Sequence, residues 1–395
     1  MTDPRRAVLL TLCIFFLHPF ALGGWLAFIP MVKETLGLNK AELAVALLGL
    51  PVAVVPGLQL ASRVIGRLGP RRVMMVMFPS QAVVVLLPLL AVSQGTLFLA
   101  LMGFGVVMAF LQVCLNVFAG RLEKELGRSV MNRCHGFWAL GLMVGPLVVT
   151  ALAAWPPVLA LALSAGLTGA IGAVLARRLP ALRDANAGGP APKRKLREVP
   201  VALVAISVFA LAVAMTEGAM ADWAAVYLSE RLPEGSRWVG LGVSIYAAFL
   251  AGGRLAGDWL KDRIGAVALA RLTYGLAVAG LVLLIAPLPL GMAFAGFALV
   301  GAGASVGFPL GVSAAAAMDD RFEGQNIAIM STVAISGFLI GPPMIGFLAE
   351  SFSLRVGLAA LLPFLAAGIV LAGWLKPGSA ADSGESRALE AESSG

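Results

Sequence analysis

The stretch PALRDANAGGPAPKRKLREV, residues 180–199, is the one long polar segment inside this chain of 395 residues. It is rich in Pro, Gly and Ala and carries several basic residues. On both sides of it the sequence is dominated by apolar runs: hydrophobic residues make up 59% of the chain, charged residues 13%, and the mean hydropathy is +0.93. A soluble domain carries about twice that share of charge, so the composition predicts a polytopic membrane protein.

Twelve apolar runs flank this linker, six on each side. Most are about 20 residues long, which is the length of helix that crosses the hydrocarbon core of a bilayer. The predicted spans are residues 7–32, 41–61, 73–92, 96–120, 134–154, 157–179, 200–228, 238–260, 272–286, 291–318, 328–349 and 356–375. We therefore expect an all-α membrane protein with an N-terminal half over 1–179, a linker over 180–199, a C-terminal half over 200–376 and a disordered tail over 377–395.

The basic residues predict the orientation of these spans. If the N-terminus is cytoplasmic, most of the 29 Lys and Arg residues, including those of the linker, fall in cytoplasmic segments. This excess predicts a multi-pass protein of the inner membrane with both termini in the cytoplasm. The basic residues of these loops account for the net charge of +8, so we expect no nucleic-acid partner. Separately, we expect the protein to be a monomer.

Two motifs recur in the two halves at one offset. Arg67 and Gly69 of GRLGPRR (66–72) align with Arg263 and Gly265 of DRIGAVALAR (262–271), 196 residues further on. The same offset relates Gly141, Gly145 and Pro146 in the fifth span to Gly337, Gly341 and Pro342 in the eleventh. Two six-span halves in parallel repeat are typical of secondary transporters, whose solute site lies near the midplane between the halves.

The loops RLGPRR and GDWLKDRIG resemble the two copies of the loop signature of the major facilitator superfamily, Gly-x-x-x-Asp-Arg-x-Gly-x-Arg. The first copy has Ser62 and Gly66 where the signature has Gly and Asp, and the second has Asp258 at the first Gly position. The stretches NRCHGFWALG (132–141), EGAMADW (217–223), GASVGFPLGVSAAA (303–316) and GPPMIGFLAE (341–350) resemble the bacterial YbjJ-type and MosC-type permeases. The resemblance implies that the twelve helices form two pseudo-symmetric halves.

Two carboxylates interrupt the apolar span after the linker. Glu217 lies roughly 25 Å into the span at about 1.5 Å per residue, still within the hydrocarbon. A lone carboxylate there should face a cavity, find a partner or be protonated. We expect Glu217 to exchange protons or to bind the solute, with a structural hydrogen bond as the alternative. Asp222 lies on another face of the helix and closer to its end. We expect it to be exposed to water there, with a role in the site as the alternative.

Other polar and aromatic side chains in the spans are further candidates for the coupling or solute site. His18 lies near the middle of the first span, where it either titrates or packs as a neutral ring. Gln112 and Asn116 are four residues apart and share a helix face, so they either line a cavity or join helices. The aromatic candidates for a cavity wall are Trp138, Trp223 and Tyr246, with interfacial or structural roles as the alternatives.

Charged residues at the cytoplasmic ends of the spans are candidates for a gate. Asp262 and Arg263 are expected to contact the other half when the inner side is closed and to release it when that side opens. The alternative is that these loops only set the topology, which does not explain an acid among bases. The other candidate gating residues are Arg67, Arg71, Asp258 and His135.

These features together predict a secondary active transporter that moves a small polar solute, such as a sugar, a polyol or an amine-like metabolite, with a proton as coupling ion. The alternative is a proton-coupled drug or metabolite exporter with a more apolar cavity, because GLMVGP (141–146) resembles an antiporter motif. We expect no enzyme activity, cofactor or metal site, since the two His residues lie far apart and no nucleophile set is evident. No phosphate-binding loop is present to use ATP.

Overall fold

The computed structural model describes residues 4–127, 130–180, 198–319 and 322–376. Within these residues the chain forms twelve helical segments long and apolar enough to cross a membrane. The same ranges contain no strand. The predicted all-α fold with twelve membrane spans is therefore confirmed. The predicted disordered tail over 377–395, and nearly all of the predicted linker, lie outside the described residues.

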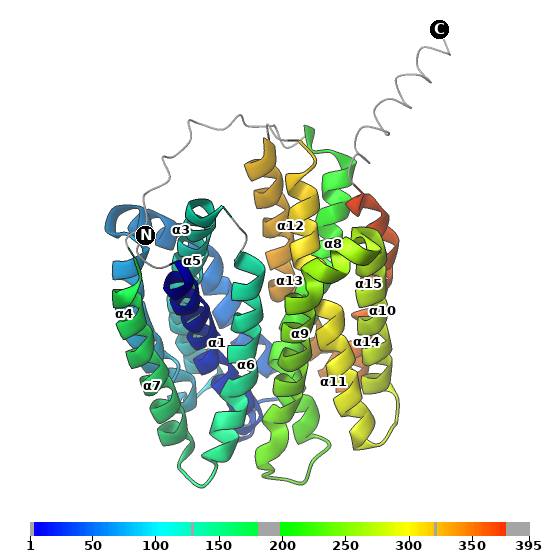
Figure 1. Ribbon diagram of the computed structural model, residues 1–395. Coiled ribbons are helices and arrows are strands. Elements are labelled where there is room, and N and C mark those ends of the chain that lie inside the picture. The colour runs from blue at the N-terminus through cyan, green and yellow to red at the C-terminus, as the bar shows by residue number, and fades with distance from the viewer. Residues whose placement is uncertain (1–3, 128–129, 181–197, 320–321, 377–395) are drawn as a thin grey trace.

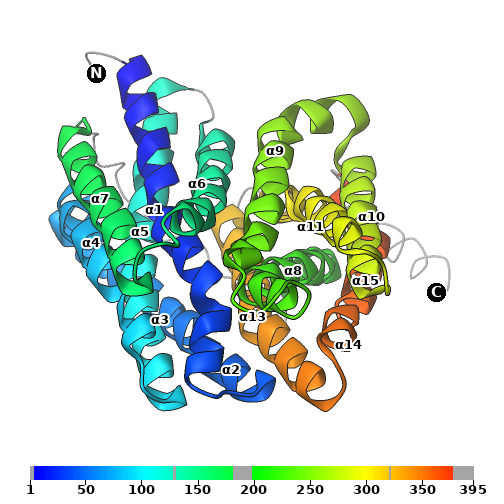
Figure 2. The same cartoon turned by 90° about the horizontal axis from the view of Figure 1, so that it is seen from below.

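The spans form two bundles that lie side by side (Figures 1 and 2). The first six spans are α1 (Pro4–Thr35), α2 (Lys40–Leu47) with α3 (Gly49–Leu68), α4 (Pro70–Val84) with η1 (Leu87–Leu90), α5 (Gln94–Leu126), α6 (Met131–Ala151) and α7 (Pro157–Arg178). The last six are α8 (Val201–Ser229), η3 (Arg237–Gly240) with α9 (Leu241–Ile264), α10 (Ala266–Ile285), α11 (Leu290–Ala304) with α12 (Gly307–Ala316), α13 (Glu323–Ser351), and α14 (Leu354–Ala359) with α15 (Leu362–Leu371) and η5 (Ala372–Leu375).

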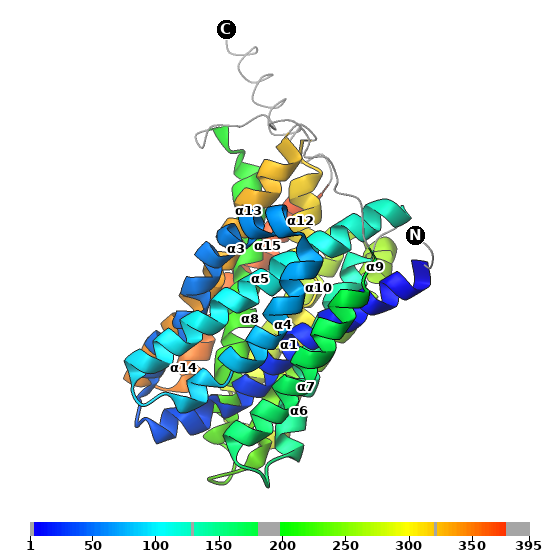
Figure 3. The ribbon, with the colours of Figure 1, turned by 90° about the vertical axis from the view of Figure 1, so that its left-hand side faces the viewer.

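The bundles have a linker end, next to residues 180–199 between the halves, and an opposite, far end. The linker end is where α7 finishes at Arg178 and α8 begins at Val201, and α1 also starts there (top of Figure 1). The far end carries the turns between α1 and α2 and between α8 and η3. Figure 3, which faces the N-terminal half, shows α4 and α7 in contact on the outside of that half.

The repeated loop motif has the same backbone conformation in both halves. Gly69, between α3 and α4, has φ 79° and ψ 151°, and Gly265, between α9 and α10, has φ 79° and ψ 160°. Backbone with positive φ is readily adopted only by glycine. This shared turn explains why glycine stands at both positions, 196 residues apart, and why the next span starts immediately in each half.

The glycines of the second repeated motif allow close helix packing. A Cβ at Gly141 of α6 would collide with the carbonyl oxygen of Phe16 in α1. A Cβ at Gly337 of α13 would lie 2.8 Å from the backbone nitrogen of Met215 in α8. In each half the fifth span is therefore pressed against the first, as small residues permit in membranes. This packing accounts for the motif without reference to the direction of transport.

Replacing Gly141 by Ala should destabilise the protein, because the new methyl group must push α6 away from α1. Overpacking of this kind costs about 1–3 kcal/mol. Gly103→Ala in α5 is the matched control, since its added Cβ would meet nothing within 4 Å. Thermal unfolding in detergent should show a lower midpoint for Gly141→Ala only. Equal midpoints for the two variants would contradict the close approach of the helices.

Two seams join the halves, and they differ along their length. Along the first seam α6 packs against α9. Near the linker end Asn132 Nδ2 donates to Asp258 Oδ1 (2.5 Å). Closer to the far end Ser244 Oγ donates to the Met143 carbonyl (2.9 Å). Along the second seam α13 packs mainly on the short α2, at the far end, and only slightly on α3. The halves therefore meet along both seams at the far end but along one seam at the linker end.

Candidate functional site

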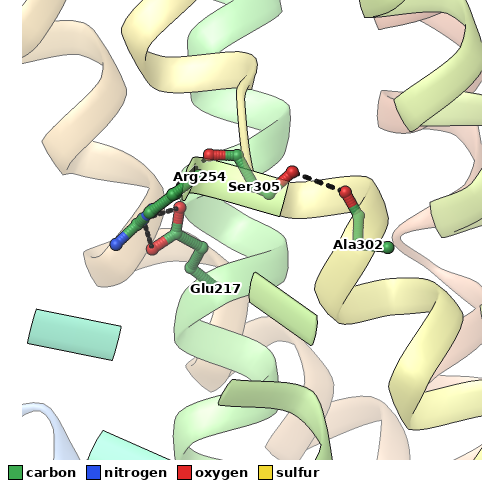
Figure 4. Close-up of polar contacts among 4 residues, drawn as sticks. All are labelled: Glu217, Arg254, Ala302 and Ser305. Carbon is green, nitrogen blue, oxygen red and sulfur yellow. Dashed lines mark hydrogen bonds and ion pairs between the residues drawn. The ribbon is translucent and has the colours of Figure 1, made fainter. Parts of the chain in front are cut away.

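Glu217 of α8 is paired with Arg254 of α9. Arg254 Nη2 donates to both carboxylate oxygens, at 3.0 and 3.1 Å, and Arg254 Nε lies 3.4 Å from the carbonyl oxygen of Ser305 between α11 and α12 (Figure 4). The two side chains are only 15% and 10% exposed. A charge-assisted pair with this little solvent is much stronger than a pair on a protein surface.

This pair shows which of the three predicted outcomes applies to Glu217, because its carboxylate has a partner. Its partner lies 37 residues further along the chain, on the next span. Because α8 and α9 run in opposite directions, positions well inside both spans come to the same depth. Arg254 is one of the 29 Lys and Arg residues of the chain, but it lies ten residues before the end of α9 at Ile264, or about 15 Å inside. That depth was the available sequence signal.

The Glu217–Arg254 pair lies at the boundary between the two halves. The Arg254 guanidinium carbon is 5.9 Å from the centre of the Trp138 ring, which belongs to α6 of the other half. Such a cation–aromatic contact is worth about 0.5–2 kcal/mol. Trp138, predicted as a solute-site residue, is thus brought to Glu217. His135, one turn earlier on α6, lies within electrostatic range of Arg254, and its ring packs edge-on against Phe15 of α1 at 5.7 Å.

Two buried donors near the pair have no hydrogen-bond partner within the described part of the chain. They are the Trp138 indole nitrogen and the Tyr246 hydroxyl. Tyr246 is 2% exposed and lies within electrostatic range of both Glu217 and Arg254. Buried polar groups are almost always satisfied, so two unpartnered donors beside one ion pair are unusual. The structure therefore brings three of the predicted site residues, Glu217, Trp138 and Tyr246, together with Arg254, which the sequence did not single out.

Asp222 does not lie exposed to water at the end of its helix. It is half-buried and stands seven residues before Ser229, where α8 ends. It makes no hydrogen bond or ion pair to any residue that the structure describes. The expectation of a solvated end residue is thus wrong, because α8 continues past Asp222 for two further turns. Asp222 remains a candidate for the site.

The N-terminal half holds a second polar group of side chains, within its own core. His18 of α1 is fully buried and lies against Gln81 of α4 and Gln112 of α5. Gln81 Nε2 donates to the His18 carbonyl at 2.9 Å. Gln81 was not singled out from the sequence, although an amide in an apolar span is a signal. Asn116, half-buried like Gln112, has an unpartnered buried side-chain oxygen among the described atoms.

Trp223 lies in the core of the C-terminal half. It is fully buried, and its indole nitrogen donates to the Pro342 carbonyl of α13 at 3.0 Å. Tyr227, one turn later, donates its hydroxyl to the Leu284 carbonyl at 2.7 Å. Both donors are therefore satisfied inside the bundle. In this conformation Trp223 joins α8 to α13 and forms no wall of an opening.

The predicted gating residues are spread over several places. Asp258 contacts the other half through Asn132, as described above. Arg71 donates to the Arg177 carbonyl at 2.7 Å, which is a contact within the N-terminal half. Arg67, Asp262 and Arg263 are exposed at the linker end, where the Arg263 guanidinium lies 4.3 Å from the Trp259 ring centre. A gating role for Asp262 stays a prediction about a conformation in which the linker end is closed.

Comparisons with known proteins agree with this architecture. The chain is similar to the membrane protein MosC of Rhizobium meliloti, with 30% identity over 380 residues that cover 94% of this chain and 90% of MosC. It is also 30% identical over 354 residues to an MFS-type transporter of Yersinia pestis, covering 88% of this chain and 91% of that protein. A crystal structure of a mutant of the nucleoside transporter NupG has a TM-score of 0.71 at 15% identity, covering 93% of this chain and 98% of NupG.

The family match covers both halves of the chain. The model of the Major Facilitator Superfamily matches residues 11–297 and again residues 239–394. The fold and the relatives point to a membrane transporter rather than an enzyme, and they agree with the resemblance to the MosC-type branch. With twelve membrane spans, a repeated loop turn and this match, the chain belongs to the Major Facilitator Superfamily.

Proposed function

We propose that this protein is a secondary active transporter that moves a small polar solute across the inner membrane by alternating access, with protons as the coupling ion. The observation that carries the proposal is the Glu217–Arg254 pair, which is nearly buried within the spans and lies beside Trp138 of the other half. Intramembrane charges of this kind are rare and usually mark a path for solute or protons. The proposed site lies between the halves, where solutes bind in this architecture.

The chemistry of the pair supports proton coupling. When Glu217 is ionised it holds Arg254 through two charge-assisted hydrogen bonds. A proton on Glu217 removes the negative charge and releases the guanidinium for other partners, such as the solute. Arg254 also touches Trp138 of the other half, so its release changes the contact between the halves. Protonation is thereby linked both to binding and to the relative position of the halves.

The orientation is proposed from the basic residues. The positive-inside rule assigns the linker end to the cytoplasm. The halves meet along both seams at the far end, so in this orientation the protein faces inward. The glycines of the antiporter-like motif pack α6 against α1, so we take no direction of transport from this motif.

Purified protein in liposomes that contain a pH-sensitive dye tests the function directly. A panel of sugars, polyols, nucleosides and amines is added outside, and internal pH is followed. At least one solute should drive protons across the membrane in protein-containing liposomes and not in empty ones. Solute flux without any proton movement would contradict the coupling, and the lack of flux for every class would contradict the transporter for small polar solutes.

Contacts at the far end predict how the inward-facing form is held. Lys40, the first residue of α2, pairs with Glu230 at 2.7 Å, and its backbone N–H donates to Glu350 at 2.9 Å. Both acids belong to the C-terminal half. Each contact is worth about 0.2–1 kcal/mol, so removing both should change the ratio of outward- to inward-facing molecules by about fivefold.

The double variant Glu230→Gln/Glu350→Gln tests this contact. Spin labels at Glu34 and Phe352, both exposed at the far end, should report more molecules with a long distance between the halves. Glu125→Gln, an exposed acid at the linker end, is the control and should leave the distribution unchanged. If the double variant matches the control, these contacts do not hold the far end closed.

A further inference from the structure

α8 exposes very little of its middle section. Between Ala212 and Leu228 every side chain is buried except those of Glu217, Ala221 and Asp222. Two of these three are carboxylates, which lipid does not accept at this depth. Both acids therefore leave α8 on its less buried side, in directions about 140° apart.

Small residues of α8 lie between the two acids, and α13 packs against one of them, Gly218. Asp222 follows Glu217 by five positions, which is about 7.5 Å along the helix and about 140° around it. Gly218 and Ala221 lie on the arc between them. A Cβ at Gly218 would already approach Phe338 Cδ1 to 3.0 Å and Pro342 Cγ to 3.1 Å, both in α13. The two carboxylates are thus separated by the contact of α13 with Gly218 and not by a side chain of α8.

The two acids differ in charge balance. Glu217 is neutralised by Arg254, which gives it both of its short hydrogen bonds from one nitrogen. Asp222 has neither a cation nor a hydrogen-bond donor among the residues that the structure describes. With all three groups ionised, the site has a net charge of −1. An anionic ligand would add to an uncompensated charge, whereas a single positive charge would cancel it.

We infer that Asp222 binds a cationic group of charge +1, namely the ammonium group of an amine-bearing solute. This inference rests on the proposed transport function and names the substrate class of the same site. The Tyr246 hydroxyl, which is 2% exposed and has no partner among the described residues, is a further group near the ion pair that a ligand can satisfy. A sodium ion offers the same single charge, so the test distinguishes the two sources.

The first experiment needs no ligand. Removing an uncompensated charge should stabilise the empty protein, whereas removing a compensated one should destabilise it by leaving Arg254 unpaired. In amine-free and sodium-free buffer, Asp222→Asn should therefore raise the thermal midpoint by about 2 °C or more, and Glu217→Gln should lower it by a similar amount. Glu125→Gln, an exposed acid, should do neither. An unchanged or lowered midpoint for Asp222→Asn would overturn the inference.

The second experiment compares matched compounds by thermal shift on the wild type and on Asp222→Asn. The pairs are glucosamine and glucose, ethanolamine and ethylene glycol, and NaCl and KCl at equal ionic strength. At least one amine should raise the wild-type midpoint more than its neutral analogue does, and Asp222→Asn should abolish that difference.

A sodium effect that depends on Asp222, without any amine effect, would assign the cation to the coupling ion and overturn the substrate class. If no compound distinguishes the variant from the wild type, Asp222 binds no cation. Neither result touches the proposed transport function, because the dye-loaded liposomes measure proton flux for neutral solutes as well. Conversely, amine binding without any flux would refute the transport function but would still support the amine-binding site at Asp222.

Discussion

Arg254→Gln should lose transport and should unfold at a markedly lower temperature than the wild type. The substitution leaves Glu217 charged and without its partner in a position that is only 15% exposed. Removing one member of a buried pair costs about 3–5 kcal/mol, and the remaining exposure places this pair near the lower value. The loss should therefore be about 3 kcal/mol, well beyond that of an average substitution.

The double variant Glu217→Gln/Arg254→Gln separates the charge from the packing. It has no unpaired charge, so it should recover at least half of the lost stability while remaining unable to couple protons. Arg263→Gln is the matched control, because Arg263 is an exposed arginine near the end of the same helix. If Arg254→Gln unfolds with the same midpoint as Arg263→Gln, the Glu217–Arg254 pair does not stabilise the protein.

Glu217→Gln should bind and exchange solute but fail to accumulate it. Glutamine retains the size and hydrogen bonding of the side chain and removes its ability to titrate. With a pH gradient of about one unit and one proton per solute, coupled transport gives about tenfold accumulation, and the variant should give none. Uptake into liposomes with and without the gradient measures this ratio, and counterflow at equal pH measures exchange.

The same measurement separates the two roles expected for Glu217. If Glu217 anchors the solute instead of carrying the proton, exchange itself should fall, because a charge-assisted hydrogen bond of about 1.5–3 kcal/mol is lost. Glu125→Gln, at the exposed linker end of α5, should accumulate solute like the wild type. Full accumulation by Glu217→Gln would show that Glu217 has only a structural role, as the partner of Arg254.

The architecture of this protein was readable from the sequence. The twelve spans follow from hydrophobic runs, because a bilayer requires each crossing segment to be long, apolar and hydrogen-bonded within itself. The internal repeat could also be predicted from the sequence, because the fold requires glycine at the same positions in both halves. Gly69 and Gly265 must adopt a positive φ, and Gly141 and Gly337 must admit a neighbouring backbone, so glycine recurs at both pairs of positions.

The partners of the polar residues were decided only by the tertiary structure. In the sequence Glu217 is an isolated carboxylate, because its counter-ion lies 37 residues away on an antiparallel helix. Hydropathy carries no information about which side chains meet. Trp223 turns its donor to the Pro342 carbonyl inside its own bundle, whereas Trp138 reaches Arg254 across the boundary between the halves. The sequence thus determined the position of each charge along its span. The packing of helices determined which charge is compensated and which, at Asp222, has no partner among the residues that the structure describes.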